Sequence, residues 1–120
     1  CIRDRPTYPL RVADDAISVT RRVRDEHGVD NIRLLADLYH LAVNGDDLDL
    51  VISRYADRIG HVQLADAPGR SEPGTGTIDF ARHFAAFDTA GYPGWFSLEY
   101  TQTQPDPFAW IPEFASGAHE

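Results

Sequence analysis

Residues 32–40, IRLLADLYH, combine an apolar run of strand length with a polar end at Asp37. Two later stretches repeat this arrangement, GHVQLAD around Gln63 and WFSLEY around Glu99. The intervals between these three polar residues each leave room for one helix and one strand. Polar groups at the carboxyl ends of successive parallel strands are typical of the active-site face of a (β/α) barrel.

The segments between these runs carry apolar residues at helical spacing. Aspartate is a favourable helix cap, and we predict three helices that begin at aspartates. These starts are Asp14 or Asp15, Asp46 or Asp47, and Asp79, and the first helix ends at Gly28. The residues expected to be buried are Ala16, Ile17, Thr20 and Val23 in the first helix, Leu48, Val51, Ile52 and Tyr55 in the second, and Phe80, Phe84 and Phe87 in the third.

The predicted strands cover residues 31–37, 60–65 and 95–100. A short loop follows the first strand, and residues 67–78 form the longest interior loop because they contain three glycines and two prolines. The tail is predicted to hold a short helix that starts near residues 105–107, with Phe108, Ile111 and Phe114 on its apolar face and a bend at Pro112.

This alternation of helices and strands predicts a parallel sheet with helical crossovers, an α/β fold. Three strands cannot close a barrel, and a barrel of eight units needs about 250 residues. The chain has 120 residues, starts at Cys1 and contains no methionine. We therefore expect residues 1–120 to form the carboxyl-terminal portion of a single TIM-barrel domain.

Composition excludes several classes of function. The net charge of −8 and pI near 4.9 argue against a nucleic-acid-binding protein, which needs clustered basic residues. The single cysteine, Cys1, cannot form an internal disulfide. No apolar run approaches the roughly 20 residues that span a bilayer, so we expect a soluble, cytoplasmic protein with no membrane partner.

Strand alternation predicts which polar side chains share a face of the sheet. His61 and Gln63 point the same way, as do Ser97 and Glu99 in the next strand. Asp37, Gln63 and Glu99 offer oxygen ligands, which suit a hard divalent ion such as Mg²⁺ or Mn²⁺. The alternative is that they are helix caps and hydrogen-bonding groups at strand ends. His40 and His61 can equally be structural, and Asp66 can cap the glycine-rich loop.

Four motifs carry a resemblance to a known family. They are DLYH at 37–40, the run from Gly60 to Arg70, EPGTG at 72–76, and GYPGW at 91–95 followed by Glu99 and Tyr100. Together they resemble the carboxyl-terminal half of the hydroxypyruvate isomerases, which are xylose-isomerase-like barrels. The resemblance implies metal ligands at Asp37, Gln63 and Glu99, a catalytic role in proton transfer for Glu99, and substrate contacts at His40 and Arg70. It places the other catalytic glutamate of the family two or three residues before Cys1.

The implied reaction interconverts hydroxypyruvate and tartronate semialdehyde. A proton moves between adjacent carbons through an enediolate, with Mg²⁺ or Mn²⁺ as cofactor. A 2-oxo-tetronate isomerase or a ketose 3-epimerase is an alternative, although the epimerases have histidine where this chain has Gln63. Ser71 and Thr77 also depart from the family, which often has histidine and glutamate there. A third possibility is a non-catalytic half-barrel that associates through its open sheet edges, with a second copy or with the other half of the barrel.

Overall fold

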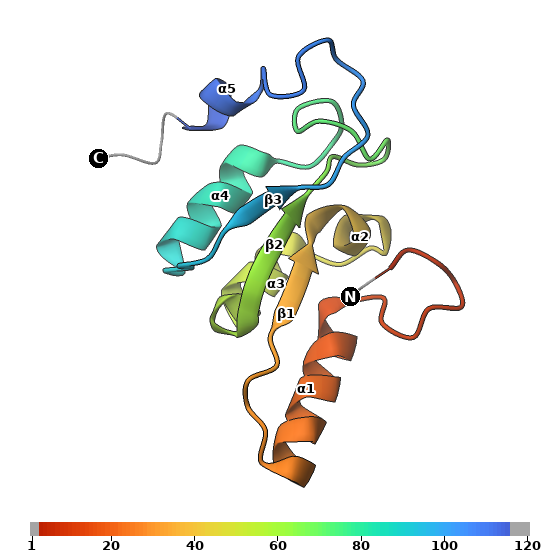
Figure 1. Ribbon diagram of the computed structural model, residues 1–120, viewed down its shortest axis with the longest axis vertical. Helices are drawn as coiled ribbons and strands as arrows, with labels where there is room; N and C mark the ends of the chain where they lie inside the picture. The colour runs from red at the N-terminus through yellow and green to blue at the C-terminus, as the bar shows by residue number, and fades with distance from the viewer. Residues whose placement is uncertain (1–2, 116–120) are drawn as a thin grey trace.

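The computed structural model describes residues 3–115, and its strands form one parallel sheet. Cys1 and residues 116–120 of the predicted tail lie outside the described residues. In the described part of the chain, β1 (Leu34–Asp37), β2 (Ile59–Leu64) and β3 (Phe96–Leu98) lie side by side in that order. All three point the same way, as Figure 1 shows. The predicted alternation of helices with parallel strands is confirmed.

The two outer strands, β1 and β3, are shorter than predicted because each has only one neighbour in the described sheet, whereas β2 has the predicted length. Residues 31–33 precede β1 as exposed, unpaired backbone, and Ile32 is 45% exposed. Pairing continues one residue beyond each end of β3, since the N–H of Val62 donates to the carbonyl of Trp95 and the N–H of Glu99 donates to that of Leu64. The carboxyl ends of the strands remain aligned.

The helices follow the predicted capping pattern at several ends. The described helices are α1 (Ala13–His27), α2 (Leu38–Val43), α3 (Leu48–Tyr55) with the 3₁₀ turn η1 (Ala56–Arg58), α4 (Phe80–Thr89) and α5 (Ile111–Ala115). Asp47 caps α3 by accepting from two backbone N–H groups, and Asp79 caps α4 by accepting from one. Gly28 ends α1 in the left-handed conformation, with φ of 69°. None of the helices within residues 3–115 is long and apolar enough to cross a membrane.

The first helix begins at Ala13, and the predicted cap at Asp15 is confirmed, because its carboxylate accepts from the Val12 N–H at 3.1 Å. The carboxylate of Asp46 also accepts from the Ala13 N–H at 2.7 Å. One predicted helix start is wrong. The tail helix begins at Ile111 instead of near residues 105–107, where Asp106 accepts from the Phe108 N–H and forms a turn. Phe108 consequently stays 55% exposed.

Residues 38–43 were expected to be a loop and instead form α2. The carboxylate of Asp37 accepts from the His40 N–H at 3.2 Å, which is the bond of an N-cap. Leu38 and Leu41 are fully buried on the inner side of this short helix. Tertiary burial and the cap together stabilise a helix that is too short to persist alone.

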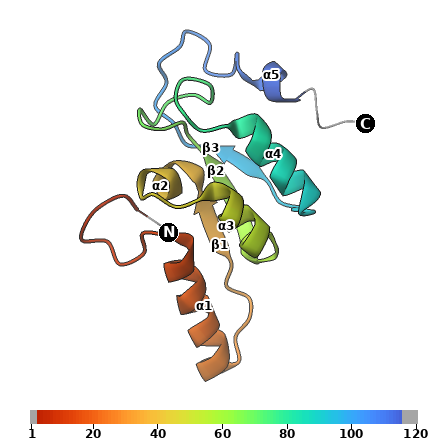
Figure 2. The ribbon, with the colours of Figure 1, turned by 180° about the vertical axis from the view of Figure 1, so that it is seen from behind.

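The core lies on one side of the sheet. Figure 2 shows α3 and α4 lying over the same face of the strands. Val62 and Leu64 of β2 are buried on that side, and Phe96 packs against Phe84 and Phe87 with ring centroids 5.2 and 5.3 Å apart. The opposite face carries half-buried polar residues, as strand alternation predicts. The described chain measures 48 × 39 × 19 Å, a thickness that suits one sheet and one layer of helices.

Candidate active site

The sheet register brings the three predicted ligands to the carboxyl ends of the strands, on one face of the sheet. Asp37 is the last residue of β1 and pairs with Gln63, which in turn pairs with Ser97. Residues paired between parallel strands project to the same face, and Glu99 lies two residues beyond Ser97 on that face. Gln63 therefore sits on the middle strand, between the strands that carry Asp37 and Glu99.

Asp37 is a buried carboxylate, with 2% of its surface exposed. Burial raises its pKa above the usual range, the His40 N–H works in the opposite direction, and the neighbouring Glu99 carboxylate raises the pKa further. Asp37 and Glu99 thus interact across the middle strand, although their own strands are not neighbours. Asp37 caps α2, which is the alternative role considered for it from the sequence, and it also lies near the carboxylate of Glu99.

Glu99 lies beside Arg70. Its Oε2 is 3.4 Å from Nη2 of Arg70, and this oxygen is buried without a hydrogen-bond partner among the residues that the structure describes. The Arg70 guanidinium also lies 5.4 Å from the ring centroid of Tyr39, within cation–π range. Unlike a loop arginine that only water surrounds, Arg70 is therefore held in the site by two contacts.

His40 is buried behind Asp37, with 1% of its surface exposed. Its Nδ1 lies 3.1 Å from the Asp4 carboxylate, and Arg3 donates to its Nε2 at 3.3 Å. The same Nε2 is 3.8 Å from Oδ2 of Asp37. Sequence reasoning missed Asp4, Arg3 and the role of Tyr39, because no local spacing signals a contact between segments so far apart in the chain.

The remaining polar candidates have structural partners. His61 makes a hydrogen bond of 2.8 Å to Ser97, which confirms that the two share a face. Asp66 does not face the site, since its carboxylate accepts four backbone hydrogen bonds from its own loop. The donors are the N–H groups of Ala67 at 2.8 Å, Gly74 at 2.9 Å, Gly76 at 2.8 Å and Ile78 at 3.0 Å. Asp66 is thus the cap of the glycine-rich loop.

The donor set fits a hard divalent cation. Two carboxylates that approach each other are costly unless a proton or a cation lies with them. The buried Oε2 of Glu99 makes no hydrogen bond to the described residues, although the Arg70 guanidinium lies 3.4 Å away. Within residues 3–115, no three or more His, Cys, Asp or Glu side chains form a group that could hold a metal. The third oxygen donor here is the amide of Gln63, a ligand type that Mg²⁺ and Mn²⁺ accept.

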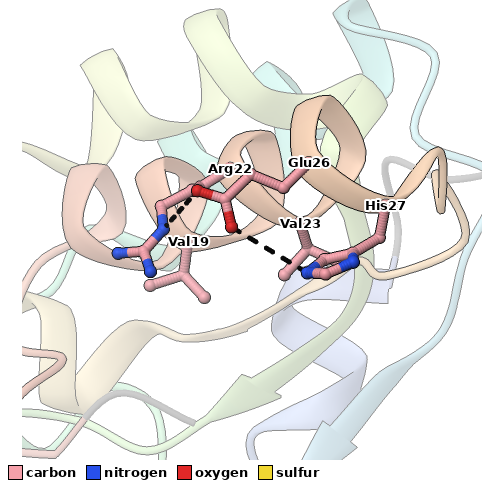
Figure 3. Close-up of a pocket in the computed structure, with 5 residues that line it drawn as sticks. All are labelled: Val19, Arg22, Val23, Glu26 and His27. Atoms are coloured by element: carbon pink, nitrogen blue, oxygen red, sulfur yellow. Dashed lines mark hydrogen bonds and ion pairs between the residues drawn. The ribbon is translucent and has the colours of Figure 1, made fainter.

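A surface depression of about 260 Å³ lies away from these residues, on α1. Figure 3 shows its lining, Val19, Arg22, Val23, Glu26 and His27. Glu26 pairs with Arg22 at 3.0 Å and lies 3.8 Å from His27, and these side chains are largely exposed. The charged groups here pair with one another, so the depression does not take part in the chemistry of the strand ends.

Comparison with known proteins identifies the family. The family model described as xylose isomerase-like TIM barrel matches residues 5–116. The chain belongs to the xylose isomerase-like TIM barrel family. This membership confirms the predicted fold class, and the described strands and helices are part of such a barrel.

Relatives within this family carry related names. A protein from Streptomyces coelicolor named "Putative hydroxypyruvate isomerase" is 45% identical over 119 residues, covering 96% of this chain and 42% of that protein. A 2-oxo-tetronate isomerase from Cupriavidus necator is 35% identical over 98 residues, covering 82% of this chain and 36% of that protein. The resemblance to hydroxypyruvate isomerases is confirmed.

A solved member of the xylose isomerase-like fold superposes closely. The crystal structure of AP endonuclease, family 2 from Brucella melitensis matches with a TM-score of 0.83 and 27% identity. The match covers 94% of this chain and 44% of that one. The chain thus spans less than half the length of these relatives.

Proposed function

We propose that this chain supplies part of the active site of a divalent-metal-dependent isomerase that interconverts hydroxypyruvate and tartronate semialdehyde. The observation that carries the proposal is the register that aligns Asp37 with Gln63 and Gln63 with Ser97, which brings Glu99 to the same face at the carboxyl ends of the strands. The 45% identity to the Streptomyces coelicolor protein supports the substrate. Because the chain spans 42% of that relative, the activity is proposed for the protein that contains the whole barrel.

Asp37, Gln63 and Glu99 would hold the ion, Mg²⁺ or Mn²⁺. When bound, such an ion polarises the carbonyl and hydroxyl oxygens of the substrate and favours loss of the adjacent proton. Glu99 moves this proton, since its Oε2 makes no hydrogen bond to the described residues and has only the Arg70 guanidinium beside it, at 3.4 Å. Residue Glu99 therefore serves both as a ligand and as an acid–base group.

Arg70 and His40 are the proposed substrate contacts. The Arg70 guanidinium, held between Tyr39 and Glu99, is placed to pair with the carboxylate of an α-hydroxy-oxo acid. Nε2 of His40 lies 3.8 Å from the Asp37 carboxylate and accepts from Arg3, while the Asp4 carboxylate lies 3.1 Å from Nδ1. Both groups would orient the substrate over the ligands.

Substrate assays test this proposal. The purified full-length protein should convert hydroxypyruvate in the presence of Mg²⁺ or Mn²⁺, lose activity with a chelator, and regain it when the ion is returned. Glu99→Gln should abolish turnover, whereas Glu113→Gln, the same change at an exposed position on α5, should not. Full activity in Glu99→Gln would refute the role of this residue.

A 2-oxo-tetronate isomerase is a second candidate, favoured by the 35% identity to the Cupriavidus necator enzyme. A panel of hydroxypyruvate, a 2-oxo-tetronate and a ketose separates it and the epimerases from the first proposal. A nuclease activity, which the name of the Brucella melitensis protein suggests for that relative, is disfavoured here by the net charge of −8.

A non-catalytic half-barrel is the proposal from a different class. Trp95 is 82% exposed, and each outer strand lacks a neighbour on one side within residues 3–115. Such a half-barrel would pair with a second copy or with the rest of the barrel through these edges. Absence of turnover with every substrate, together with a dimeric mass in solution, would favour it over an enzyme.

A further inference from the structure

Glu72 is a buried carboxylate for which neither the proposed reaction nor the metal set has a use. It lies in the loop of residues 67–78, two positions after Arg70, and only 2% of its surface is exposed. Its carboxylate accepts from the N–H of Thr103 at 2.8 Å, from the Thr103 hydroxyl at 2.6 Å, and from the N–H of Gln104 at 3.0 Å. These donors belong to the segment that follows β3 and Glu99.

A further hydrogen bond, between backbone groups, joins the same two segments. The N–H of Thr101 donates to the carbonyl of Arg70 at 2.8 Å. Arg70 itself has a φ of 55°, a left-handed conformation that a non-glycine residue keeps only where its surroundings hold it. The loop that carries Arg70 and the segment after Glu99 are thus fastened together at two points that follow directly on the pair joining Arg70 to Glu99 at 3.4 Å.

The far part of the loop is held independently. The Asp66 carboxylate accepts from the N–H groups of Gly74, Gly76 and Ile78. A Cβ added at Gly76 would lie 2.1 Å from the carbonyl oxygen of Ala67, so the backbone is closely packed there. Two buried carboxylates therefore hold the loop. Asp66 binds the backbone of the loop itself, and Glu72 binds the segment after β3.

We propose that Glu72 is a positioning residue that holds Arg70 against Glu99 and so sets the place where the substrate carboxylate binds. Glu72 does not touch the substrate, and it acts by fastening the loop of residues 67–78 to residues 101–104. Three donors converge on it: Oε1 accepts from the N–H groups of Thr103 and Gln104, and Oε2 accepts from the Thr103 hydroxyl. Hydrogen bonds to a charged carboxylate are stronger than those to a neutral acceptor. The inference rests on the proposed function, because Arg70 is the proposed contact for the substrate acid.

The test is a double-mutant cycle of Glu72→Ala with Arg70→Ala in the full-length protein. Alanine offers no acceptor to the two backbone N–H groups and the Thr103 hydroxyl, so the loop should separate from residues 101–104. We expect Glu72→Ala to raise KM for hydroxypyruvate by about tenfold or more, with a smaller change in kcat. In the Arg70→Ala background the same change should alter KM by less than about twofold, because Glu72 acts through Arg70.

Two further variants separate positioning from general loss of stability. Asp47→Ala removes the cap of α3, which also accepts two backbone hydrogen bonds, and should leave KM unchanged. Thr103→Val removes only the hydroxyl donor and should raise KM in the same direction by a smaller factor. An unchanged KM in both Glu72→Ala and Thr103→Val, or equal effects of Glu72→Ala in the two backgrounds, would overturn the inference.

Hydrogen exchange distinguishes this inference from the proposed function. If the wild-type protein converts none of the acids, the proposed function fails, but the fastening by Glu72 can still be measured. Exchange at the amides of Thr101 and Thr103 should be at least about tenfold faster in Glu72→Ala, with exchange in α1 unchanged. Equal exchange in the wild-type protein and the variant would show that Glu72 does not hold this segment.

Discussion

Asp66→Asn is predicted to destabilise the protein although it changes neither the size nor the shape of the side chain. Asp66 is 1% exposed, and its two oxygens accept four backbone hydrogen bonds. Asparagine has one acceptor oxygen, so two of these bonds are lost and an NH₂ group faces their donors. The amide would turn towards Gly74 and Gly76, which are exposed and can bind water instead.

The magnitude follows from counting these bonds. Each donor left without a partner costs about 1 kcal/mol where water can reach it and up to about 3 kcal/mol where it cannot. The two bonds that remain lose their charged acceptor, at roughly 0.5 kcal/mol each. The free energy of unfolding should fall by about 3 kcal/mol.

Urea unfolding followed by circular dichroism measures this loss. The matched control is Asp79→Asn. Asp79 caps α4 through one exposed hydrogen bond, and asparagine caps a helix as well as aspartate does. The control should therefore change the free energy of unfolding by less than about 0.5 kcal/mol. A loss below about 1 kcal/mol in Asp66→Asn, similar to that of the control, would refute the view that this carboxylate organises the loop.

Three further predictions concern the same region. Gly76→Ala should weaken the loop, because its Cβ would meet the Ala67 carbonyl at 2.1 Å, and limited proteolysis should then cut residues 67–78 faster; an unchanged cleavage rate would contradict this. The Thr103 hydroxyl and backbone N–H groups hold the pKa of Glu72 at about 2, below its usual 4.5. The stabilisation from Glu72 is therefore complete above about pH 4.5 and is lost as the pH falls towards 2. This loss of unfolding free energy with falling pH should be smaller in Glu72→Gln. An equal loss in the variant would show that another group is responsible. In the metal-free protein, burial and Glu99 raise the pKa of Asp37, so the unfolded state ionises first and stability falls as pH rises above about 3.8. Asp37→Asn should remove that fall and stabilise the metal-free protein at neutral pH, as thermal unfolding would show.

Much of the fold could be predicted from local patterns. The apolar runs ending at Asp37 and Gln63 become β1 and β2, and Asp47, Asp79 and Gly28 cap helices as their residue types predict. Helix α2 was not predicted, because two buried leucines are too few to reveal the 3.6-residue periodicity of an amphipathic helix. The cap of α1 by Asp15 follows from the residue type, whereas the bond from the Ala13 N–H to Asp46 could not be predicted, because Asp46 comes from a distant part of the chain.

The site also has features that the sequence predicts and features that only the tertiary structure shows. Alternation along the strands predicts that Gln63 and Glu99 face one side, and the register confirms their alignment with Asp37. The approach of Asp37 to Glu99, the pairing of Asp4 with His40 and the fastening by Glu72 depend on tertiary structure. No spacing in the sequence indicates them, since each joins residues from different elements.

Crystals of the full-length protein soaked in Mn²⁺ test the central claim most directly, by anomalous scattering. The account predicts one peak at about 2.2 Å from carboxylate oxygens of Asp37 and Glu99 and from the amide oxygen of Gln63. The peak should disappear in Asp37→Asn and remain in Asp79→Asn. No peak at these residues, or a peak that survives Asp37→Asn with full occupancy, would contradict the assignment of this strand edge as a metal-dependent isomerase site.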